Sequence, residues 1–279
     1  MLIIIIIITV IALFLIYGHL SNYHFVTRHY DVFTDGRTKE LRFVVIADLH
    51  DCCHGRGNSK LLAKIKELTP DAVLIPGDLT IKYDSPRKKR VTDMLELLKE
   101  LCRDYPVYYS PGNHEIRMED YGAYKEELEH LGVKYAENRE FVFSDPGIRI
   151  YGLDLPIEWY RENLSLSADQ LGTFLNRPGV EEADCYTILL AHDPRHFDAY
   201  STWGADLTVS GHLHGGIMRL PVLGGVISPS LGLFPKYDGG AFEKNGKNMI
   251  VSRGLGSHTL KFRFFNPPEL VVIDLKSKK

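Results

Sequence analysis

Two histidines, His212 and His214, lie one residue apart in the sequence Ser-Gly-His-Leu-His-Gly-Gly at residues 210–216. The apolar residues 205–209 predict a short strand before them, which should deliver both imidazoles into a tight turn that the glycines permit. On a strand both side chains would share one face, but in a turn they can point to two different places. An isolated His-x-His pair is equally compatible with an ordinary surface turn. The pair becomes informative if other candidate ligands end at the same place.

Side chains of similar chemistry follow other predicted strands. Nearly continuous apolar runs at residues 41–47, 72–75, 107–109 and 186–191 are typical of strands buried on both faces. Because sites in open α/β sheets are built at the carboxyl ends of strands, we expect the polar residues that follow these runs to converge. With the turn included, these residues are Asp48, His50, Asp78, Asn113, His114, His192, His212 and His214.

The chemistry of this set predicts bound metal. Carboxylate, imidazole and amide oxygen are ligands of intermediate hardness that suit Mn²⁺, Fe²⁺ or Zn²⁺, and of these we expect Mn²⁺ first. A structural zinc site would use thiolates instead. The set is too large for one ordinary catalytic ion, whereas two ions about 3.5–4 Å apart would use it fully. This is the two-metal arrangement that performs phosphoryl chemistry.

The elements that position these residues alternate between strand and helix. Helical spacing or capping residues predict helices within residues 57–68, from Ser85-Pro86 to Leu101, over 120–131 and from a capping box at 167–170. From residue 217 to 275 the chain is rich in glycine and β-formers, which predicts a second sheet packed on the first. The sequence therefore predicts an α/β fold.

Composition narrows the class of protein. The chain has 279 residues, 44% of them hydrophobic, and a formal net charge of -3, which suits one large globular domain and disfavours a nucleic-acid binder with a basic face. Residues 1–17 carry no charged side chain, and with residues 18–20 the run approaches the roughly 20 residues that span a bilayer. The basic start and small-residue cleavage site of a signal peptide are not visible, so we expect an uncleaved membrane anchor.

The side of the membrane follows from weaker signals. Arg28, Arg37 and Lys39 lie after the apolar run, so the positive-inside tendency favours a cytoplasmic catalytic domain. The four cysteines show no disulfide framework, which favours the same side. The expected organisation is an anchor at 1–20, a juxtamembrane linker or first hairpin at 21–39, a catalytic domain at 40–276 and a tail at 277–279. The oligomeric state is not predicted.

Five ordered motifs resemble a known family. They are Asp48-x-His50, Gly77-Asp78, Gly112-Asn113-His114-Glu115, His192 and Gly211-His212-x-His214, and in this order they resemble the calcineurin-like metallophosphoesterases. The later stretches 215–216, 232–237 and 252–256 are similar to the membrane-associated bacterial branch that includes UDP-2,3-diacylglucosamine pyrophosphatase-like proteins. The resemblance covers about residues 40–276. It implies a four-layer αββα sandwich of two mixed sheets flanked by helices.

The resemblance also implies a role for each motif residue. Asp78 would bridge two metal ions, and His114 would lie beside the second ion without binding it, where it would donate a proton to the leaving oxygen or stabilise charge there. Glu115 would orient His114 or simply begin a helix. The remaining ligands would be Asp48, His50 and His214 for the first ion and Asn113, His192 and His212 for the second.

The expected activity is hydrolysis of a phosphodiester or pyrophosphate bond by a metal-bound hydroxide, with no protein nucleophile. The membrane anchor suggests a lipid-linked substrate, and the resemblance implies one such as UDP-2,3-diacylglucosamine. The alternatives are a catalytically silent membrane scaffold with a structural metal pair and a phosphoprotein phosphatase. Because every motif position is filled, the scaffold is disfavoured.

Four further residues have two interpretations each. Arg253 and Lys236 are candidates for binding a substrate phosphate or diphosphate, and ordinary surface ion pairing explains them equally well. Cys52 and Cys53, directly after the first motif, depart from the family pattern. We expect small buried loop residues there, and the alternative is an influence on metal choice or oxidation.

Overall fold

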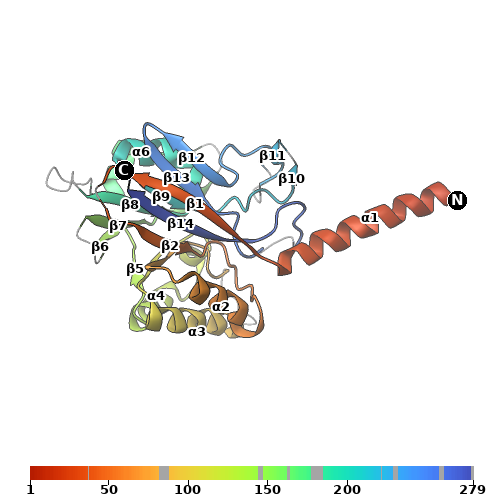
Figure 1. Cartoon of the computed structure of the whole chain (residues 1–279), viewed down its shortest axis with the longest axis horizontal. Helices are drawn as coiled ribbons and strands as arrows, with labels where there is room; N and C mark the ends of the chain where they lie inside the picture. The colour runs from red at the N-terminus through yellow and green to blue at the C-terminus, as the bar shows by residue number, and fades with distance from the viewer. Residues whose placement is uncertain are drawn as a thin grey trace.

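The computed structural model describes residues 1–36, 38–81, 88–143, 147–161, 164–176, 185–220, 222–228, 232–257 and 261–277, with the backbone alone at 88–92. Over these residues the chain forms two six-stranded sheets packed face to face, with helices on both outer faces (Figure 1). An apolar helix, α1, projects from one side of this four-layer domain (Figure 1). The predicted α/β class with two mixed sheets and flanking helices is confirmed.

The first sheet has the order β1-β14-β2-β3-β4-β5. Its strands from β2 to β5 are parallel to one another, and β14 is antiparallel to β2, with Val271 opposite Val45. β1 runs parallel to β14 along its whole length. The bounds are β1 (Val26–Thr34), β2 (Leu41–Val45), β3 (Ala72–Pro76), β4 (Val107–Ser110), β5 (Lys134–Tyr135) and β14 (Glu269–Ser277).

The second sheet has the order β12-β13-β9-β8-β7-β6, and its four inner strands are parallel. The edge strands β12 and β6 are antiparallel to their neighbours. The bounds are β6 (Arg139–Val142), β7 (Ile148–Leu153), β8 (Tyr186–Ala191), β9 (Leu207–Ser210), β12 (Gly240–Lys244) and β13 (Lys247–Val251). Two short strands, β10 (Arg219–Leu220) and β11 (Gly224–Gly225), form a separate hairpin.

Helices cover both sheets. The first sheet packs against α2 (Ser59–Leu68), α3 (Lys88–Asp104) and α4 (Tyr121–His130), and the second against α5 (Ala168–Phe174) and α6 (Phe197–Trp203). The other helices are α1 (Leu2–Leu20) and the 3-10 turns η1 (Ser21–Tyr23), η2 (Arg56–Asn58), η4 (Glu115–Arg117), η5 (Ile157–Tyr160) and η7 (Pro194–His196). The capping box of α5 forms as predicted, since the Gln170 N–H donates to Ser167 Oγ at 3.1 Å and the Ser167 N–H donates to Gln170 Oε1 at 2.9 Å.

Alternation along the strands explains why they are buried on both faces. In β2, Val44 points to the helical layer that holds Leu61, while Phe43 and Val45 point between the sheets. In β8, Ile188 and Leu190 point between the sheets, whereas Leu189 and Ala191 point to α5 and α6. Each strand therefore needs apolar residues at every position, because successive side chains enter different cores.

Two parts of the chain differ from expectation. The stretch 217–275 does not form a sheet of its own, because β12 and β13 join the second sheet while β14 inserts into the first between β1 and β2. Within the expected linker, residues 26–34 form β1, whose backbone pairs with β14 because that strand would otherwise be an open sheet edge. The predicted helix start at Ser85-Pro86 and residues 278–279 of the tail lie outside the described residues.

The apolar start of the chain is helical and uncovered. Among the described residues, one segment, Leu2–Tyr23, is long and apolar enough to cross a membrane by length and composition, with a mean hydropathy of 2.8. Within α1 only Gly18 is buried. The domain therefore does not supply the surface that this helix would need to be a core helix of a soluble protein.

Candidate metal centre

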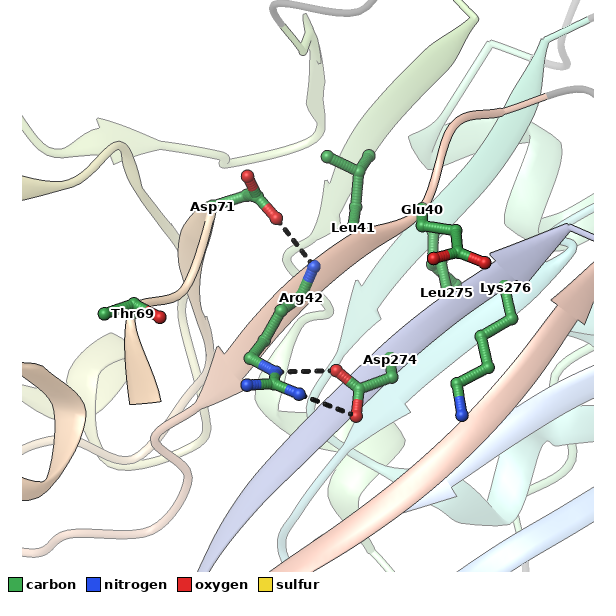
Figure 2. A pocket seen from close by; sticks show the side chains of 8 residues that line it. All are labelled: Glu40, Leu41, Arg42, Thr69, Asp71, Asp274, Leu275 and Lys276. Carbon is green, nitrogen blue, oxygen red and sulfur yellow. Dashed lines mark hydrogen bonds and ion pairs between the residues drawn. The ribbon is translucent and has the colours of Figure 1, made fainter. Parts of the chain in front are cut away.

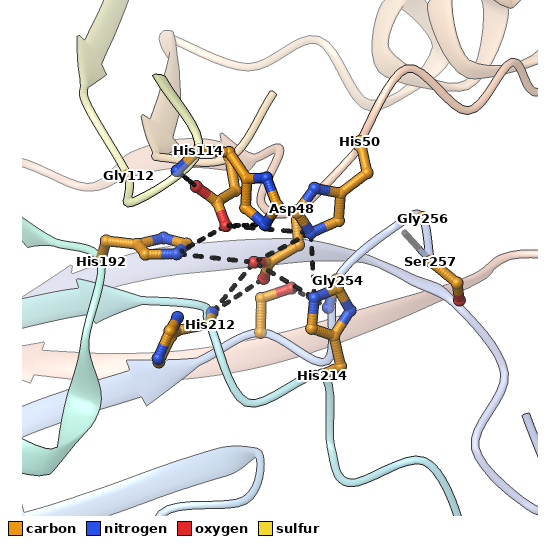
Figure 3. Close-up of polar contacts among 12 residues, drawn as sticks. Asp48, His50, Gly112, His114, His192, His212, His214, Gly254, Gly256 and Ser257 are labelled. Atoms are coloured by element: carbon orange, nitrogen blue, oxygen red, sulfur yellow. Dashed lines mark hydrogen bonds and ion pairs between the residues drawn. The ribbon is translucent and has the colours of Figure 1, made fainter. Parts of the chain in front are cut away.

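The loops that follow β2, β3, β4, β8 and β9 meet at one edge of the two sheets (Figure 3). Backbone hydrogen bonds join them: Asp48 N donates to Gly77 O at 3.2 Å, His50 N donates to Asp78 O at 3.2 Å, and Gly211 N donates to His192 O at 3.0 Å. The parallel strands deliver their carboxyl ends to the same place, as in other α/β sites. The sequence candidates from five separate segments are thereby brought together.

One group of possible ligands consists of Asp48, His50 and His214, each offering one atom within 4.8 Å of the others. The Nε2 atoms of His50 and His214 lie 3.0 Å apart, and their rings stack with centroids 4.9 Å apart. Asp48 Oδ1 is 3.9 Å from His50 Nε2 and 3.7 Å from His214 Nε2. All three residues are buried. The three possible ligand atoms therefore face one small volume.

A second group consists of Asp78, His192 and His212, again within 4.8 Å of one another. His192 Nε2 lies 3.0 Å from Asp78 Oδ2, and its Nδ1 lies 2.8 Å from Pro76 O, which fixes the ring. The same Asp78 oxygen is 3.9 Å from His50 Nε2 in the first group. Asp78 therefore lies between the two groups.

The backbone at the centre is held in an unfavourable region. Asp48, His50, Asp78, His212 and His214 have φ values of 49°, 49°, 54°, 72° and 52°, in the left-handed region that favours glycine. Such conformations cost about 1–3 kcal/mol each and persist where the surrounding structure imposes them. Here they turn the side chains back toward the strand ends, so the fold holds strain to aim the ligands.

Glycines allow the loops to approach the two carboxylates. A Cβ at Gly112 would collide with Asp78 Oδ1, and a Cβ at Gly211 would collide with Asp48 Oδ2. The backbone N–H groups then reach the carboxylates directly, since His114 N donates to Asp78 Oδ1 at 2.9 Å and His212 N donates to both oxygens of Asp48 at 3.0 Å. The two glycines thus let neighbouring loops orient the two acids.

Burial and mutual charge perturb these groups strongly. Burial raises the pKa of Asp48 to about 7 against the opposing effect of His192. Burial also raises the pKa of Asp78, but the imidazoles of His192, His114 and His50 outweigh it and hold that pKa well below its usual range. Burial lowers the pKa of His192, but Asp78 and Asp48 outweigh it and raise the value to about 10. Burial lowers the pKa of His212 to about 4.

The donor set fits divalent metal. Buried carboxylates and imidazoles at these distances compete for protons, and a divalent cation takes the place of such protons in a metal site. Asn113 supports the same conclusion, because its Oδ1 is buried and has no hydrogen-bond partner among the described residues. A buried amide oxygen without a donor normally costs free energy unless something binds it. The residues present are therefore suited to hold a pair of ions.

His114 lies at the rim of this centre. Its Nε2 is 3.9 Å from Asp78 Oδ2, and its ring meets that of His50 edge-on with centroids 4.9 Å apart. The side chain is 15% exposed, in contrast to the fully enclosed rings of His50 and His192. His114 is close enough to the acids to count as a third possible ligand group with His50 and Asp78, and open enough to reach a substrate.

Glu115 has a larger role than the sequence suggested. It is buried, and its carboxylate accepts hydrogen bonds from the backbone N–H groups of Asp78, Thr80 and Gly112 and from the Tyr109 hydroxyl. Burial and the charge of Asp78 raise its pKa, and these hydrogen bonds oppose the rise. Glu115 thus joins the loops after β3 and β4. Its position next to His114 was the only signal in the sequence.

Two residues behind His214 had no sequence signal. Arg263 is buried, and its Nη2 donates to Gly256 O at 2.6 Å and lies 3.4 Å from His214 Nδ1. Asn266 Nδ2 donates to His214 O at 2.7 Å. Burial lowers the pKa of Arg263 to about 10. Both residues come from the loop before β14, more than forty residues from the His212–His214 turn, so only the fold brings them there.

The other candidates lie less directly at the centre. Arg253 Nε is 3.6 Å from Glu269 Oε2, and the backbone N–H of Arg253 donates to Glu269 Oε1 at 2.9 Å. Lys236 is exposed, with its Nζ 4.8 Å from the centroid of the Tyr237 ring. Cys52 is half-buried and Cys53 is exposed, so the expectation of two buried loop cysteines is wrong for Cys53.

A separate hollow of about 300 Å³ lies away from the centre, lined by residues at the start of β2 and in β14 (Figure 2). Two of its acidic residues pair with Arg42. Arg42 Nε donates to Asp274 Oδ1 at 2.7 Å, and the backbone N–H of Arg42 donates to Asp71 Oδ2 at 2.7 Å (Figure 2). Among the described residues, its lining forms no group of three candidate metal ligands such as those at the candidate metal centre.

Comparison with known proteins agrees with this geometry. A sequence model described as calcineurin-like phosphoesterase matches residues 41–216. An uncharacterized metallophosphoesterase of Campylobacter jejuni is 28% identical over 97% of this chain and 69% of its own length. A transmembrane protein with metallophosphoesterase domain from Danio rerio is 27% identical over 85% of this chain and 53% of its own length. The UDP-2,3-diacylglucosamine pyrophosphatase LpxG of Chlamydia muridarum is 24% identical over 84% of this chain and 83% of its own length.

Among solved structures, the NAD nucleotidase of Haemophilus influenzae is similar, with a TM-score of 0.50 and 17% identity over 78% of this chain and 46% of its own length. At this identity the likeness concerns the fold. The fold of this domain is therefore similar to part of that solved structure.

Proposed function

Because this chain belongs to the calcineurin-like phosphoesterase family, we propose that it is a membrane-anchored phosphohydrolase that cleaves a phosphodiester or pyrophosphate bond. The chain is a metal-dependent phosphoesterase, and the family uses a dinuclear divalent metal centre. The proposal concerns the bond that is cleaved, the residues that act and the place where they act.

One observation carries the proposal: Asp78 Oδ2 lies 3.0 Å from His192 Nε2 in its own group of three ligand atoms and 3.9 Å from His50 Nε2 in the other group. We assign Asp78 as the bridge between two ions and His114 as the catalytic residue that is not a ligand. The remaining ligands are Asp48, His50 and His214 for one ion and Asn113, His192 and His212 for the other. Mn²⁺ is the first expectation for both positions, with Fe²⁺ and Zn²⁺ as alternatives.

When bound, the two ions would neutralise charge on the phosphoryl oxygens and activate water near neutral pH. The protein's own residues would then do the rest. Asp48 and Asp78 are fixed by backbone N–H groups of His212 and His114, so the ligands need little rearrangement. His114, which is partly exposed, would donate a proton to the leaving oxygen. Arg253 and Lys236 remain candidates for binding a further phosphate.

Three observations support a membrane location and a lipid-linked substrate. α1 is apolar along its length and is not covered by the domain. One relative is named a transmembrane protein, and another is named for hydrolysis of UDP-2,3-diacylglucosamine. We therefore propose residues 1–20 as the anchor and 40–276 as the catalytic domain, joined through β1 in the segment 21–39. Arg28 and Lys39 after the apolar run, and a cysteine spacing without a recognisable disulfide framework, favour a cytoplasmic domain.

Metal analysis combined with hydrolysis tests the activity. Purified full-length protein in detergent should bind about two Mn²⁺ per chain and hydrolyse a soluble aryl phosphodiester and a lipid pyrophosphate. Asp78→Ala should lose both metal and activity, whereas Asp71→Ala, at the hollow far from the centre, is the matched acidic control and should retain both. If Asp78→Ala hydrolyses these substrates as fast as the wild type, the assignment is wrong.

The same experiment separates the alternatives. A protein that binds two ions but cleaves no phosphate ester would be a scaffold with a structural metal pair. Cleavage of phosphopeptides in preference to diesters and pyrophosphates would indicate a phosphoprotein phosphatase. Protease protection in sealed vesicles tests the side of the membrane, because digestion of the domain from outside intact cells would contradict a cytoplasmic location.

A further inference from the structure

Aromatic side chains join α1 to the loop that precedes β14. The ring of Phe14 lies 5.2 Å from that of Phe262 and 4.4 Å from that of Phe264, measured between centroids. The ring of Tyr17 lies 5.6 Å from that of Phe264 and 6.1 Å from that of Phe265. The last turns of α1 are therefore packed on residues 262–265 of the domain.

Gly18 fixes this junction. It is the buried residue of α1, and a Cβ at this position would collide with the ring of Phe262. Its carbonyl accepts a hydrogen bond from Arg263 N at 2.9 Å. A glycine inside an otherwise branched apolar helix weakens the helix, but here it permits contact between helix and loop. This close contact and this hydrogen bond hold residues 262–263 against the last turn of α1.

The length of α1 then determines how deeply residues 262–265 would lie in a bilayer that this helix spans. Its 19 residues extend about 28 Å, close to the roughly 30 Å hydrocarbon core of a bilayer. Phe14 lies six residues before the end of α1 at Leu20, which is roughly 9 Å along the helix axis, so a bilayer that covers α1 must also reach the rings in contact with Phe14. Those rings are Phe262 and Phe264. They would lie at the boundary between hydrocarbon and headgroups, where aromatic residues are enriched.

The loop is one part of a wider surface. Arg219 N in β10 donates to Phe264 O at 3.0 Å, Val226 N donates to Met218 O at 2.8 Å, and Phe234 N donates to Val226 O at 2.9 Å. Segments 217–220, 224–228, 232–234 and 264–265 are therefore connected by backbone hydrogen bonds. Figure 1 shows the β10–β11 hairpin on the side of the domain from which α1 leaves.

Large apolar side chains are exposed on this surface. Val222 is completely exposed, Leu233 is 68% exposed and Phe234 is 57% exposed. Among the described residues beyond α1 and η1, the other exposed large hydrophobics, such as Phe33, Val142 and Leu164, lie singly on other elements. We name the surface the interfacial face and define it by Leu220, Val222, Leu223, Leu233, Phe234 and Phe265.

We infer that the interfacial face is a membrane-docking surface that inserts into the lipid headgroup region beside α1. The inference rests on the proposed membrane anchor. A lipid bilayer is the partner that fits, because the face is continuous with a helix whose exposed surface is apolar all round. An apolar surface at this depth would be covered by lipid without any further protein.

Docking would place the candidate metal centre at the membrane surface. Asn266, next to Phe265, donates to the carbonyl of His214, and Arg263 lies 3.4 Å from the His214 ring. Only Gly215 and Gly216 separate His214 from segment 217–220, which contains β10. The face and the centre therefore share the same two loops, so a phosphate group held at the headgroup level would lie next to the ligands.

Tryptophan fluorescence in vesicles tests the inference with the full chain. Leu223→Trp and Phe234→Trp place a reporter on the interfacial face, and Val142→Trp in β6 is the matched control, because Val142 is 53% exposed on another part of the domain. The proteins are reconstituted in phosphatidylcholine–phosphatidylglycerol vesicles, with or without lipids brominated near the headgroup. The signal of wild type, which contains Trp159 and Trp203, is subtracted.

Brominated lipid should lower the fluorescence of the tryptophan added at 223 or 234 by about twofold and leave that of the tryptophan added at 142 unchanged. Quenching requires contact between the indole and the lipid. If the protein floats with the vesicles and brominated lipid quenches the tryptophan to the same extent at all three positions, or at none, the inference is overturned and the anchor stands. A blue-shifted but unquenched signal at 223 and 234 would indicate cover by a second copy or another protein, and would also overturn it. Failure to float would refute the anchor itself.

Discussion

Replacing Glu115 by glutamine should loosen the centre without touching a metal ligand. The carboxylate accepts hydrogen bonds from Asp78 N at 3.0 Å and Gly112 N at 2.9 Å through Oε2. Through Oε1 it accepts from Thr80 N at 3.1 Å and the Tyr109 hydroxyl at 2.6 Å. Four donors converge on a group that only accepts, which is the role of an ionised carboxylate.

The cost follows from these donors. Glutamine keeps one acceptor oxygen, and its NH₂ group is tolerated best at the Oε1 position, where the Tyr109 hydroxyl can turn to accept. The Thr80 N–H then faces another N–H group, and a buried donor without an acceptor costs about 1–3 kcal/mol. The remaining bonds lose their charge-assisted strength at roughly 0.5 kcal/mol each. We expect Glu115→Gln to lower the free energy of unfolding by about 3 kcal/mol.

Urea unfolding of the metal-free protein in detergent, followed by circular dichroism, measures this loss. Tyr109→Phe is the control, because it removes one donor and leaves the three backbone bonds, so it should cost about 1 kcal/mol. In the Gln variant, Mn²⁺ affinity should fall by about tenfold or more, because the backbone of Asp78 loses its support. If Glu115→Gln lowers the free energy of unfolding no more than Tyr109→Phe does, the proposed role of Glu115 in joining the loops after β3 and β4 is refuted.

Three further outcomes are expected. Asp78→Asn should lower Mn²⁺ content at both positions and reduce kcat/KM by roughly 10³-fold, measured by elemental analysis and diester hydrolysis, and loss of one ion alone would contradict the bridge. His114→Asn should keep both ions and lower kcat by about 10²–10⁴-fold, whereas reduced metal content would make His114 a ligand. Burial and the charge of Glu137 raise the pKa of Asp154 to about 7. Because this pKa is above its unfolded value, the contribution of Asp154 to stability is present below about pH 4 and is lost as pH rises through 7. Asp154→Asn should therefore gain about 2 kcal/mol at pH 8 and nothing at pH 4 in chelator-treated protein, and equal gains at both would contradict this.

Much of the chemistry was predictable from local sequence. A strand buried on both faces is nearly continuously apolar, so the runs 41–47, 72–75 and 186–191 stand out as predicted strands, and the polar residues after them are marked as exceptions. The alternation of strands and helices then predicts that their carboxyl ends meet. Because these signals are local, the amino-acid sequence is sufficient to identify the eight candidate residues of the centre, from Asp48 to His214.

Other features depended on residues far apart in the chain. β14 enters the first sheet between β1 and β2, although its sequence equally suits the second sheet. Nothing in the local sequence indicated that Glu115 joins the loops after β3 and β4, or that Arg263 and Asn266 support His214. A buried charge is identified by the donors around it, and those donors come from other loops.

The apolar segment at residues 1–20 shows the same division. The sequence alone determined that this stretch is apolar enough and long enough to span a bilayer. Only the tertiary structure decided that its last turns pack on Phe262 and Phe264, and that backbone hydrogen bonds connect this loop to segments with exposed apolar side chains. Hydropathy is a property of each residue, but the neighbours of a surface are set by packing between distant segments, which no local pattern records.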